Sequence, residues 1–143
     1  MRKLLGIMGL LMILSSCSVK IVGVYYPLYK DARLAGAVRI GWIPASLVPE
    51  SATEIHERHH LDTGAAILGF SFAPEDRAHV VSGCTPIPRE ELVAPSLDNR
   101  KWWPRELVSP ETAPPNYSFF HCEAENGYLA VDEQAHQAFF WRP

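Results

Sequence analysis

The sequence predicts an α+β fold: a small, mainly antiparallel sheet with one short helix and a long proline-rich loop. Strand-like segments lie on both sides of one helix-like segment, an order typical of this class. The dipeptide Asn126-Gly127 stands between two apolar runs and is a strong hairpin signal. Seven of the twelve prolines lie within residues 85–116, so neither a long helix nor a regular sheet can cross that stretch.

The composition fits one globular domain with an N-terminal extension. The chain has 143 residues, of which 48% are hydrophobic and 20% charged, and its formal net charge is −3. A single core is expected at this length, and the hydrophobic content excludes disorder throughout. The small negative charge, without a run of Lys or Arg, argues against a nucleic-acid partner. We divide the chain into a signal peptide (1–16), a lipidated cysteine with a tether (17–37) and a single domain (38–143).

The first residues have the layout of a signal peptide. Arg2 and Lys3 precede an uncharged apolar stretch from Leu4 to Leu14. That stretch is shorter than the ~20 apolar residues that span a bilayer. The N-terminus is therefore expected to direct export rather than to remain as a membrane-spanning helix.

The segment Leu14-Ser15-Ser16-Cys17 resembles the bacterial lipobox, in which an aliphatic residue and two small residues precede the lipidated cysteine. The resemblance implies cleavage before Cys17 and acylation of this cysteine with chains such as palmitate, which anchor a protein stably in a membrane. Ser18 follows, and by resemblance to the sorting pattern of enterobacterial lipoproteins it favours the periplasmic face of the outer membrane. The alternative is an ordinary secretory signal that happens to contain a cysteine.

The predicted tether begins at residue 18 and contains an unusually aromatic segment from Val24 to Tyr29. Such a segment is too aromatic for a purely flexible linker. It could instead dock as an edge strand, a position that Pro27 suits better than the centre of a sheet.

The domain then begins with extended structure. Residues 38–44 are predicted to be extended, and residues 51–61 and 66–72 to form an antiparallel hairpin around the turn at 62–64. Alternation of side chains is clearest in 66–72, which predicts a strand that is buried on one face.

A helix is predicted over residues 74–83. Pro74 opens it, two acidic residues lie in its first turn, and Gly83 closes it. After the proline-rich loop, three further strands are expected, at residues 117–122, 128–131 and 138–141.

The cysteines suggest a disulfide. If Cys17 carries lipid, Cys84 and Cys122 remain as an even pair in an oxidising compartment, and we predict that they are bonded. The alternatives are two free buried thiols or half of a metal site. No C-x-x-C pair supports a zinc ribbon or a thioredoxin-type site.

Three of the six histidines, His56, His59 and His60, fall within five residues and are the candidate metal ligands. On a strand, His56 and His60 point to one face and His59 to the other, which leaves two ligands with Glu54 or Asp62 as a third. On a helix all three would share a face. We predict a solvated strand face without a metal or cofactor, and keep a site at His56 and His60 as the alternative.

The aromatic pairs Trp102-Trp103 and Tyr25-Tyr26 are the candidate binding residues. Aromatic pairs near prolines can form a surface for sugars, peptides or partner proteins. The alternative, which we prefer at this point, is that they fill the end of a small core.

Motifs of nucleophilic catalysis are absent from the sequence. The chain lacks Gly-x-Ser-x-Gly, Ser-x-x-Lys and a phosphate-binding glycine loop. His121 and Cys122 are adjacent, but neighbours on a strand point to opposite faces. We therefore expect a protein that is not an enzyme.

Two stretches carry a resemblance to a known group. The first includes Pro49-Glu50-Ser51-Ala52-Thr53-Glu54-Ile55, and the second ends in the aromatic run Phe139-Phe140-Trp141-Arg142. Together they resemble an uncharacterised group of bacterial proteins, often lipoproteins, with a P-x-S-A-x-x-I segment and a C-terminal aromatic strand. The resemblance covers most of residues 42–142 and implies no activity.

We therefore expect a lipid-anchored cell-envelope protein with a non-enzymatic binding or structural domain. Its expected partners are the membrane, through the N-terminal lipid, and another envelope protein. Two alternatives are a metal-binding or hydrolytic protein that uses His56, His59 and His60, and an immunity or inhibitor lipoprotein.

Overall fold

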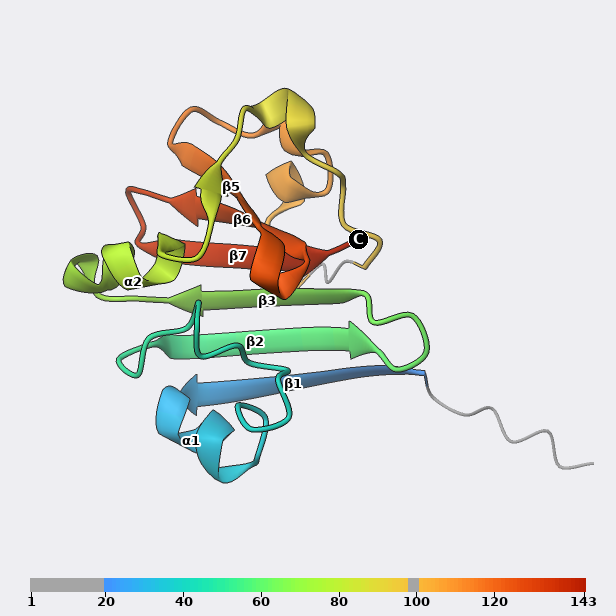
Figure 1. The fold of residues 1–143 in the computed structure, drawn as a ribbon, viewed down its shortest axis with the longest axis vertical. Coiled ribbons are helices and arrows are strands. Elements are labelled where there is room, and N and C mark those ends of the chain that lie inside the picture. The colour runs from blue at the N-terminus through green and yellow to red at the C-terminus, as the bar shows by residue number, and fades with distance from the viewer. Residues whose placement is uncertain (1–19, 98–100) are drawn as a thin grey trace, which may run out of the picture.

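The computed structural model describes residues 20–97 and 101–143, which form one seven-stranded sheet (Figure 1). Its strand order is β1-β2-β3-β7-β6-β5-β4, and every paired neighbour is antiparallel. The strands are β1 (Ile21–Leu28), β2 (Thr53–His60), β3 (Ala66–Ser71), β4 (Thr85–Pro86), β5 (Tyr117–Cys122), β6 (Gly127–Asp132) and β7 (Gln137–Arg142).

The described residues form two short α-helices, α1 (Tyr29–Leu34) and α2 (Arg77–Val81), where the sequence predicted one helix. The predicted helix over 74–83 corresponds to a 3-10 turn at Pro74–Asp76 that continues into α2. The mainly antiparallel sheet is confirmed, but the fold is richer in β-structure than expected. None of the described helices is long and apolar enough to cross a membrane.

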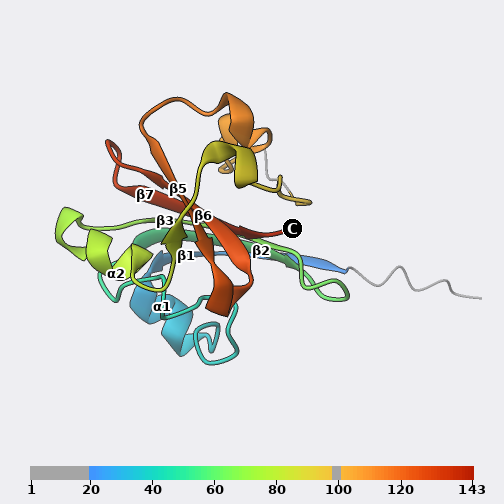
Figure 2. The same cartoon turned by 45° about the horizontal axis from the view of Figure 1, so that its top comes forward.

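The sheet carries one apolar cluster on each face because its strands alternate their side chains. One face is covered by α1, the segment 35–52 and α2, and Figure 2 shows α1 on this side. The other face is covered by the proline-rich loop, from which Trp103 and Leu107 pack against the sheet. The described part of the loop therefore packs over the β7, β6 and β5 part of the sheet.

β3 is buried on both faces, whereas the sequence predicted burial on one. Leu68 and Phe70 belong to the cluster beneath α1, and Ile67 belongs to the cluster beneath the proline-rich loop. The difference arises because β3 is a central strand, paired with β2 and β7, and both of its sides are covered.

The segment interpreted as a tether is part of the folded domain from residue 21 onward. β1 pairs with β2 from Ile21, opposite His60, to Leu28, opposite Thr53, and the side chain of Tyr26 is buried. The domain thus begins at β1 and not at residue 38, in agreement with the alternative of a docked edge strand. Cys17 lies outside the described residues.

Residues 38–44 are not extended as predicted but form consecutive turns. The amide of Ile40 donates to the carbonyl of Gly36, and the amide of Trp42 donates to that of Ala37. Gly36 and Gly41 have φ of +84°, a conformation that favours glycine. These turns bury Ile43 against the sheet, which explains the apolar residues that resembled a strand.

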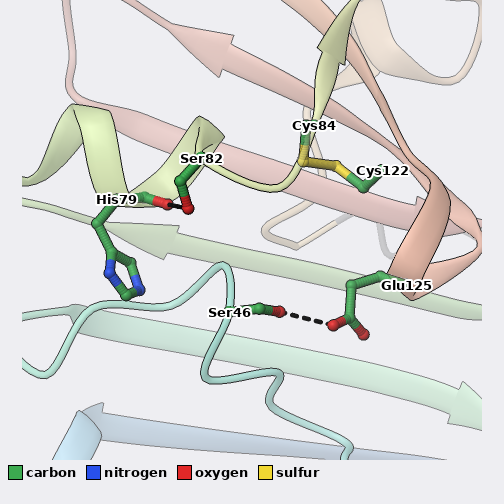
Figure 3. Close-up of a disulfide and its surroundings, with 6 residues drawn as sticks. All are labelled: Ser46, His79, Ser82, Cys84, Cys122 and Glu125. Carbon is green, nitrogen blue, oxygen red and sulfur yellow. Dashed lines mark hydrogen bonds between the residues drawn. A yellow bond between two sulfur atoms is a disulfide. The ribbon is translucent and has the colours of Figure 1, made fainter.

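The predicted disulfide between Cys84 and Cys122 is confirmed (Figure 3). It joins the segment after α2 to the end of β5 across 38 residues of sequence. In the same region Ser46 donates to Glu125 at 2.6 Å, so the segment 35–52 is also tied to the turn after β5. The start of the proline-rich loop is therefore fixed covalently to the sheet.

Candidate binding site

The aromatic side chains on the loop-covered face form a stack around Trp102. The indole of Trp102 stacks on the imidazole of His56, with ring centroids 5.1 Å apart and an interplanar angle of 18°. His56 in turn lies against Tyr25 at 4.6 Å. β1, β2 and the proline-rich loop each contribute one ring, and Tyr25 is 44% exposed.

Trp102 can reach the sheet because β3 has a glycine beneath it. A Cβ at Gly69 would lie 3.1 Å from Cζ3 of Trp102 and 3.2 Å from a ring carbon of Phe139. Trp103, its neighbour, is buried and meets Phe139 and Trp141 edge to face. The pair therefore divides its roles: Trp103 fills the core, and half-buried Trp102 forms part of the surface.

A cleft of about 350 Å³ lies beside Trp102 over β3 and β7. Three carboxylates line it: Glu54 from β2, Glu106 from the proline-rich loop and Asp132 from the end of β6. The cleft wall also contains the ring of Tyr117 and the amide of Gln137. No Lys or Arg lines the described part of this cleft.

Hydrogen bonds hold the three carboxylates in place. Tyr25 donates to Glu54 at 2.8 Å, and Tyr117 donates to Glu106 at 3.1 Å. Asp132 accepts from the backbone amides of the turn that follows it. Each carboxylate thus has a defined orientation.

The pKa shifts of the cleft agree with a negative local potential. Burial, with the charges of Glu106 and Asp132, raises the pKa of the Tyr117 hydroxyl. The hydrogen bond to Glu54 is the largest cause of the raised pKa of Tyr25. Burial lowers the pKa of His56, and the nearby charge of Glu54 opposes this effect. Both tyrosines are therefore neutral hydrogen-bond donors at physiological pH.

A second depression, of about 280 Å³, lies on the other side of Trp102. Its floor is formed by β1 and β2, and its lining includes Gly23, Tyr25, His56 and Arg58. Gly23 has no side chain to fill the space between its neighbours. Trp102 therefore stands between two hollows on one face of the sheet.

The structure gives the three clustered histidines separate roles. His56 is part of the aromatic stack, and His60 accepts from the backbone amides of Asp62 and Thr63 in the turn that follows. His59 lies on the opposite face, where its Nδ1 is 2.8 Å from Glu57 Oε2. Within the described ranges, no three His, Cys, Asp or Glu side chains are grouped so that they could hold a metal ion.

Glu57 and His59 form a buried polar pair beneath Trp42. The ring of Trp42 covers His59, with centroids 4.1 Å apart, and Glu57 is 3% exposed. Glu57 Oε1 and His59 Nε2 have no hydrogen-bond partner among the described residues. Burial is the main reason that the pKa of Glu57 is raised, and His59 partly offsets it.

The segment that forms β1, β2 and β3 is similar to a known protein family. The family model of the YbbD head domain matches residues 21–71. The matched segment contains β1, α1, β2 and β3, and with them Tyr25, Glu54 and His56 of the stack and cleft. It makes up 51 of the 143 residues, and Trp102, Glu106 and Asp132 lie outside it. No curated protein and no solved structure matches the chain.

Sequence reasoning identified only part of this site. Trp102, Tyr25 and His56 were singled out, but separately, as members of an aromatic pair or a histidine cluster. Glu106 and Asp132 carried no signal, because each is a single acid in an ordinary surface segment. The antiparallel pairing of β3, β7 and β6 brings Asp132 to the cleft, and the packing of Trp103 and Leu107 against the sheet brings Glu106 there.

Proposed function

We propose that the protein is a lipid-anchored cell-envelope protein whose domain binds another envelope protein through the Trp102 cleft. The carrying observation is the half-buried indole of Trp102, held between His56 and the cleft that Glu54 and Glu106 line. Partly exposed aromatic rings beside oriented polar groups are typical of recognition surfaces. The binding role rests on this surface, and the envelope location rests on the N-terminal sequence.

The cleft is suited to binding because its groups are fixed before a ligand arrives. Trp102 is fixed by its contacts with His56 and Gly69, and Glu106 is oriented by the hydroxyl of Tyr117. Groups held in this way lose little conformational freedom when a partner docks. A partner that presents hydrogen-bond donors or a positive charge to the carboxylates would complement the cleft.

Site-specific photo-cross-linking in cells tests the binding role. A photo-reactive residue at exposed Gln137, which lines the cleft, is expected to form one adduct of defined mass with an envelope protein. Trp102→Ala in the same chain should abolish that adduct. The same reagent at exposed Glu123, which does not line the cleft, is the control. An adduct that Trp102→Ala leaves unchanged, or no adduct at Gln137, would contradict the assignment.

Lipidation is tested separately. Cys17→Ala should abolish acyl labelling and move the protein from the membrane fraction to the soluble periplasm, because the lipid is the expected anchor. Ser18→Asp should keep the label but shift the protein from the outer to the inner membrane, according to the sorting pattern that Ser18 resembles. Unchanged labelling in Cys17→Ala would refute the lipid anchor and leave the binding site untouched.

A further inference from the structure

The two edges of the sheet are protected very differently. β4, at one edge, has two residues, one of which is Pro86, so it offers almost no backbone for pairing. β1, at the other edge, has eight residues, Ile-Val-Gly-Val-Tyr-Tyr-Pro-Leu, without a charged side chain. Natural sheets usually block a long edge with charges, prolines, bulges or a covering element. β1 has only Pro27, near its end, so the edge from Ile21 to Tyr26 has none of the blocking side chains. An edge of this kind is typical of a strand that pairs with another chain.

The hydrogen-bond pattern shows which groups of β1 face outward. The amide of Leu61 donates to the carbonyl of Lys20 at 2.7 Å, which makes these two residues a hydrogen-bonded pair. Such pairs alternate along an antiparallel ladder, so Val22, Val24 and Tyr26 also bond to β2. The alternation ends after Tyr26, because the amide of Leu28 donates to the side chain of Asp31. The residues whose amide and carbonyl groups point away from β2 are therefore Ile21, Gly23 and Tyr25.

Those outward groups have no backbone partner among the described residues. No backbone hydrogen bond outside the strand ladders involves Ile21, Gly23 or Tyr25. Pro27 has no amide hydrogen, so it offers no donor at this edge. α1 leaves the end of β1 and packs its buried residues, Tyr29 and Ala32, onto the core side of the sheet. Gly23 and Tyr25 remain exposed.

The side chains of β1 are complementary to a second β1. Tyr25 is a large exposed ring, and Gly23, two residues earlier on the same face, leaves a gap over the 280 Å³ depression. In an antiparallel pair of β1 strands, Val24 can lie opposite Val24 of the second copy, and Gly23 then lies opposite Tyr25. An aromatic ring across the strand covers the backbone of a glycine and stabilises that pairing. In this register Tyr25 of each copy lies over Gly23 of the other copy.

We propose that β1 pairs with β1 of a second copy of this chain, around a two-fold axis at Val24, to form one continuous sheet. The two-fold register uses the outward groups of Gly23 and Tyr25 on both strands, which is the isologous arrangement that most dimers have. The N-terminus supports this choice of occupant. Lys20 is three residues after Cys17, so an anchored chain would hold the start of β1 within about 10 Å of the membrane. Confinement of two such edges to one surface raises their effective concentration.

Cysteine cross-linking in intact membranes tests this pairing with the full chain. A two-fold axis at Val24 brings the two Cα atoms of residue 24 to about 4.5 Å, within the range of a disulfide. Val24→Cys should therefore form a covalent dimer under mild oxidation. Glu75→Cys, on the exposed 3-10 turn before α2, is the control for random collision and should stay monomeric.

Two further variants make the test decisive. Tyr25→Lys, combined with Val24→Cys, should reduce the cross-linked fraction at least tenfold, because it places a charge on the edge and removes the complementary ring. Trp102→Ala with Val24→Cys should cross-link normally, which separates this interface from the proposed binding cleft. Circular dichroism and Tm establish that each variant is folded.

Three outcomes would overturn the proposal. Equal cross-linking of Val24→Cys and Glu75→Cys would show collision only. A cross-link at Gly23→Cys that exceeds the one at Val24→Cys would place the axis elsewhere and refute the Tyr25–Gly23 complementarity. An adduct of Val24→Cys with a different protein would show that β1 pairs with a partner strand instead of a second copy.

Discussion

The indole of Trp102 rests on Gly69, so closely that a Cβ at residue 69 would lie 3.1 Å from Cζ3 of Trp102. Gly69→Ala is therefore expected to push Trp102 off the sheet and to open its stack on His56. The overpacking should lower the free energy of unfolding by about 1–3 kcal/mol. Tryptophan fluorescence and thermal unfolding measure the two effects. Gly83→Ala, where no atom lies within 4 Å of an added Cβ, is the matched control.

The disulfide should contribute strongly to stability. Replacement of both Cys84 and Cys122 by Ala removes a cross-link that spans 38 residues, for which the chain-entropy model gives about 4 kcal/mol. We expect a fall in Tm of roughly 5–15 °C for a domain of this size. Differential scanning calorimetry of the oxidised wild type and the double variant provides the measurement. Free thiols in unreduced, denatured wild-type protein would contradict the bond.

Glu57 should make the folded state less stable as pH rises. Its pKa is raised in the folded state, mainly by burial, so the folded protein favours the protonated carboxyl. By linkage, the stability that this group contributes is present below its ordinary pKa of about 4.5 and is lost as pH rises through the folded value. Glu57→Gln lacks this titration, and its Tm should rise relative to wild type between pH 4 and pH 8. If Tm changed with pH in the same way in Glu57→Gln and in wild type, the effect would be refuted. The control Glu123→Gln, at an exposed position, should show the same pH dependence of Tm as wild type.

Glu133 should show the opposite pH dependence. Arg77 donates to both of its carboxylate oxygens, at 2.8 and 2.6 Å, and these hydrogen bonds are the main cause of its lowered pKa. Its stabilisation is present above the ordinary pKa and is lost as pH falls through the folded value. Because the pair is partly exposed, Glu133→Gln should cost about 1 kcal/mol or less at pH 7. The Tm difference from wild type should shrink as pH falls below the ordinary pKa of about 4.5, and a difference that does not change with pH would contradict this account.

Local signals were sufficient for several elements of the fold. The dipeptide Asn126-Gly127 marked the hairpin of β5 and β6 because Asn126 has φ of +50°, and an added Cβ at Gly127 would lie 2.5 Å from Phe140. The turn before β3 was found through Gly64, which has φ of +76°. In each case one residue type satisfies a local backbone requirement, so the sequence itself contains the information.

The remaining elements depend on pairing between distant segments. β3 lies beside β7, which places Gly69 opposite Phe139, and no local pattern specifies a register between strands about seventy residues apart. The same pairing decides that β3 is buried on both faces and that Asp132 reaches the cleft of Trp102. The apolar residues of β1 do not alternate with polar ones, so the sequence predicts a tether there more readily than a strand. The apolar residues at 36–42 resemble those of a strand, so the sequence does not predict the turns that the structure has there.

The ladder between β3 and β7 joins the part of the sheet that the YbbD head domain model matches to a strand that it does not match. The similarity to the YbbD head domain stops at Ser71, the last residue of β3, and β7 comes from the unmatched remainder. Leu68 and Phe70 share one apolar cluster with Phe140 across this ladder. A gene fusion that carried residues 21–71 into another chain would therefore leave β3 with bare amides, carbonyls and apolar side chains. The sequence fused after residue 71 would have to supply a strand that replaces β7. Transfer of residues 21–71 to another chain therefore depends on the sequence that follows them as well as on their own residues.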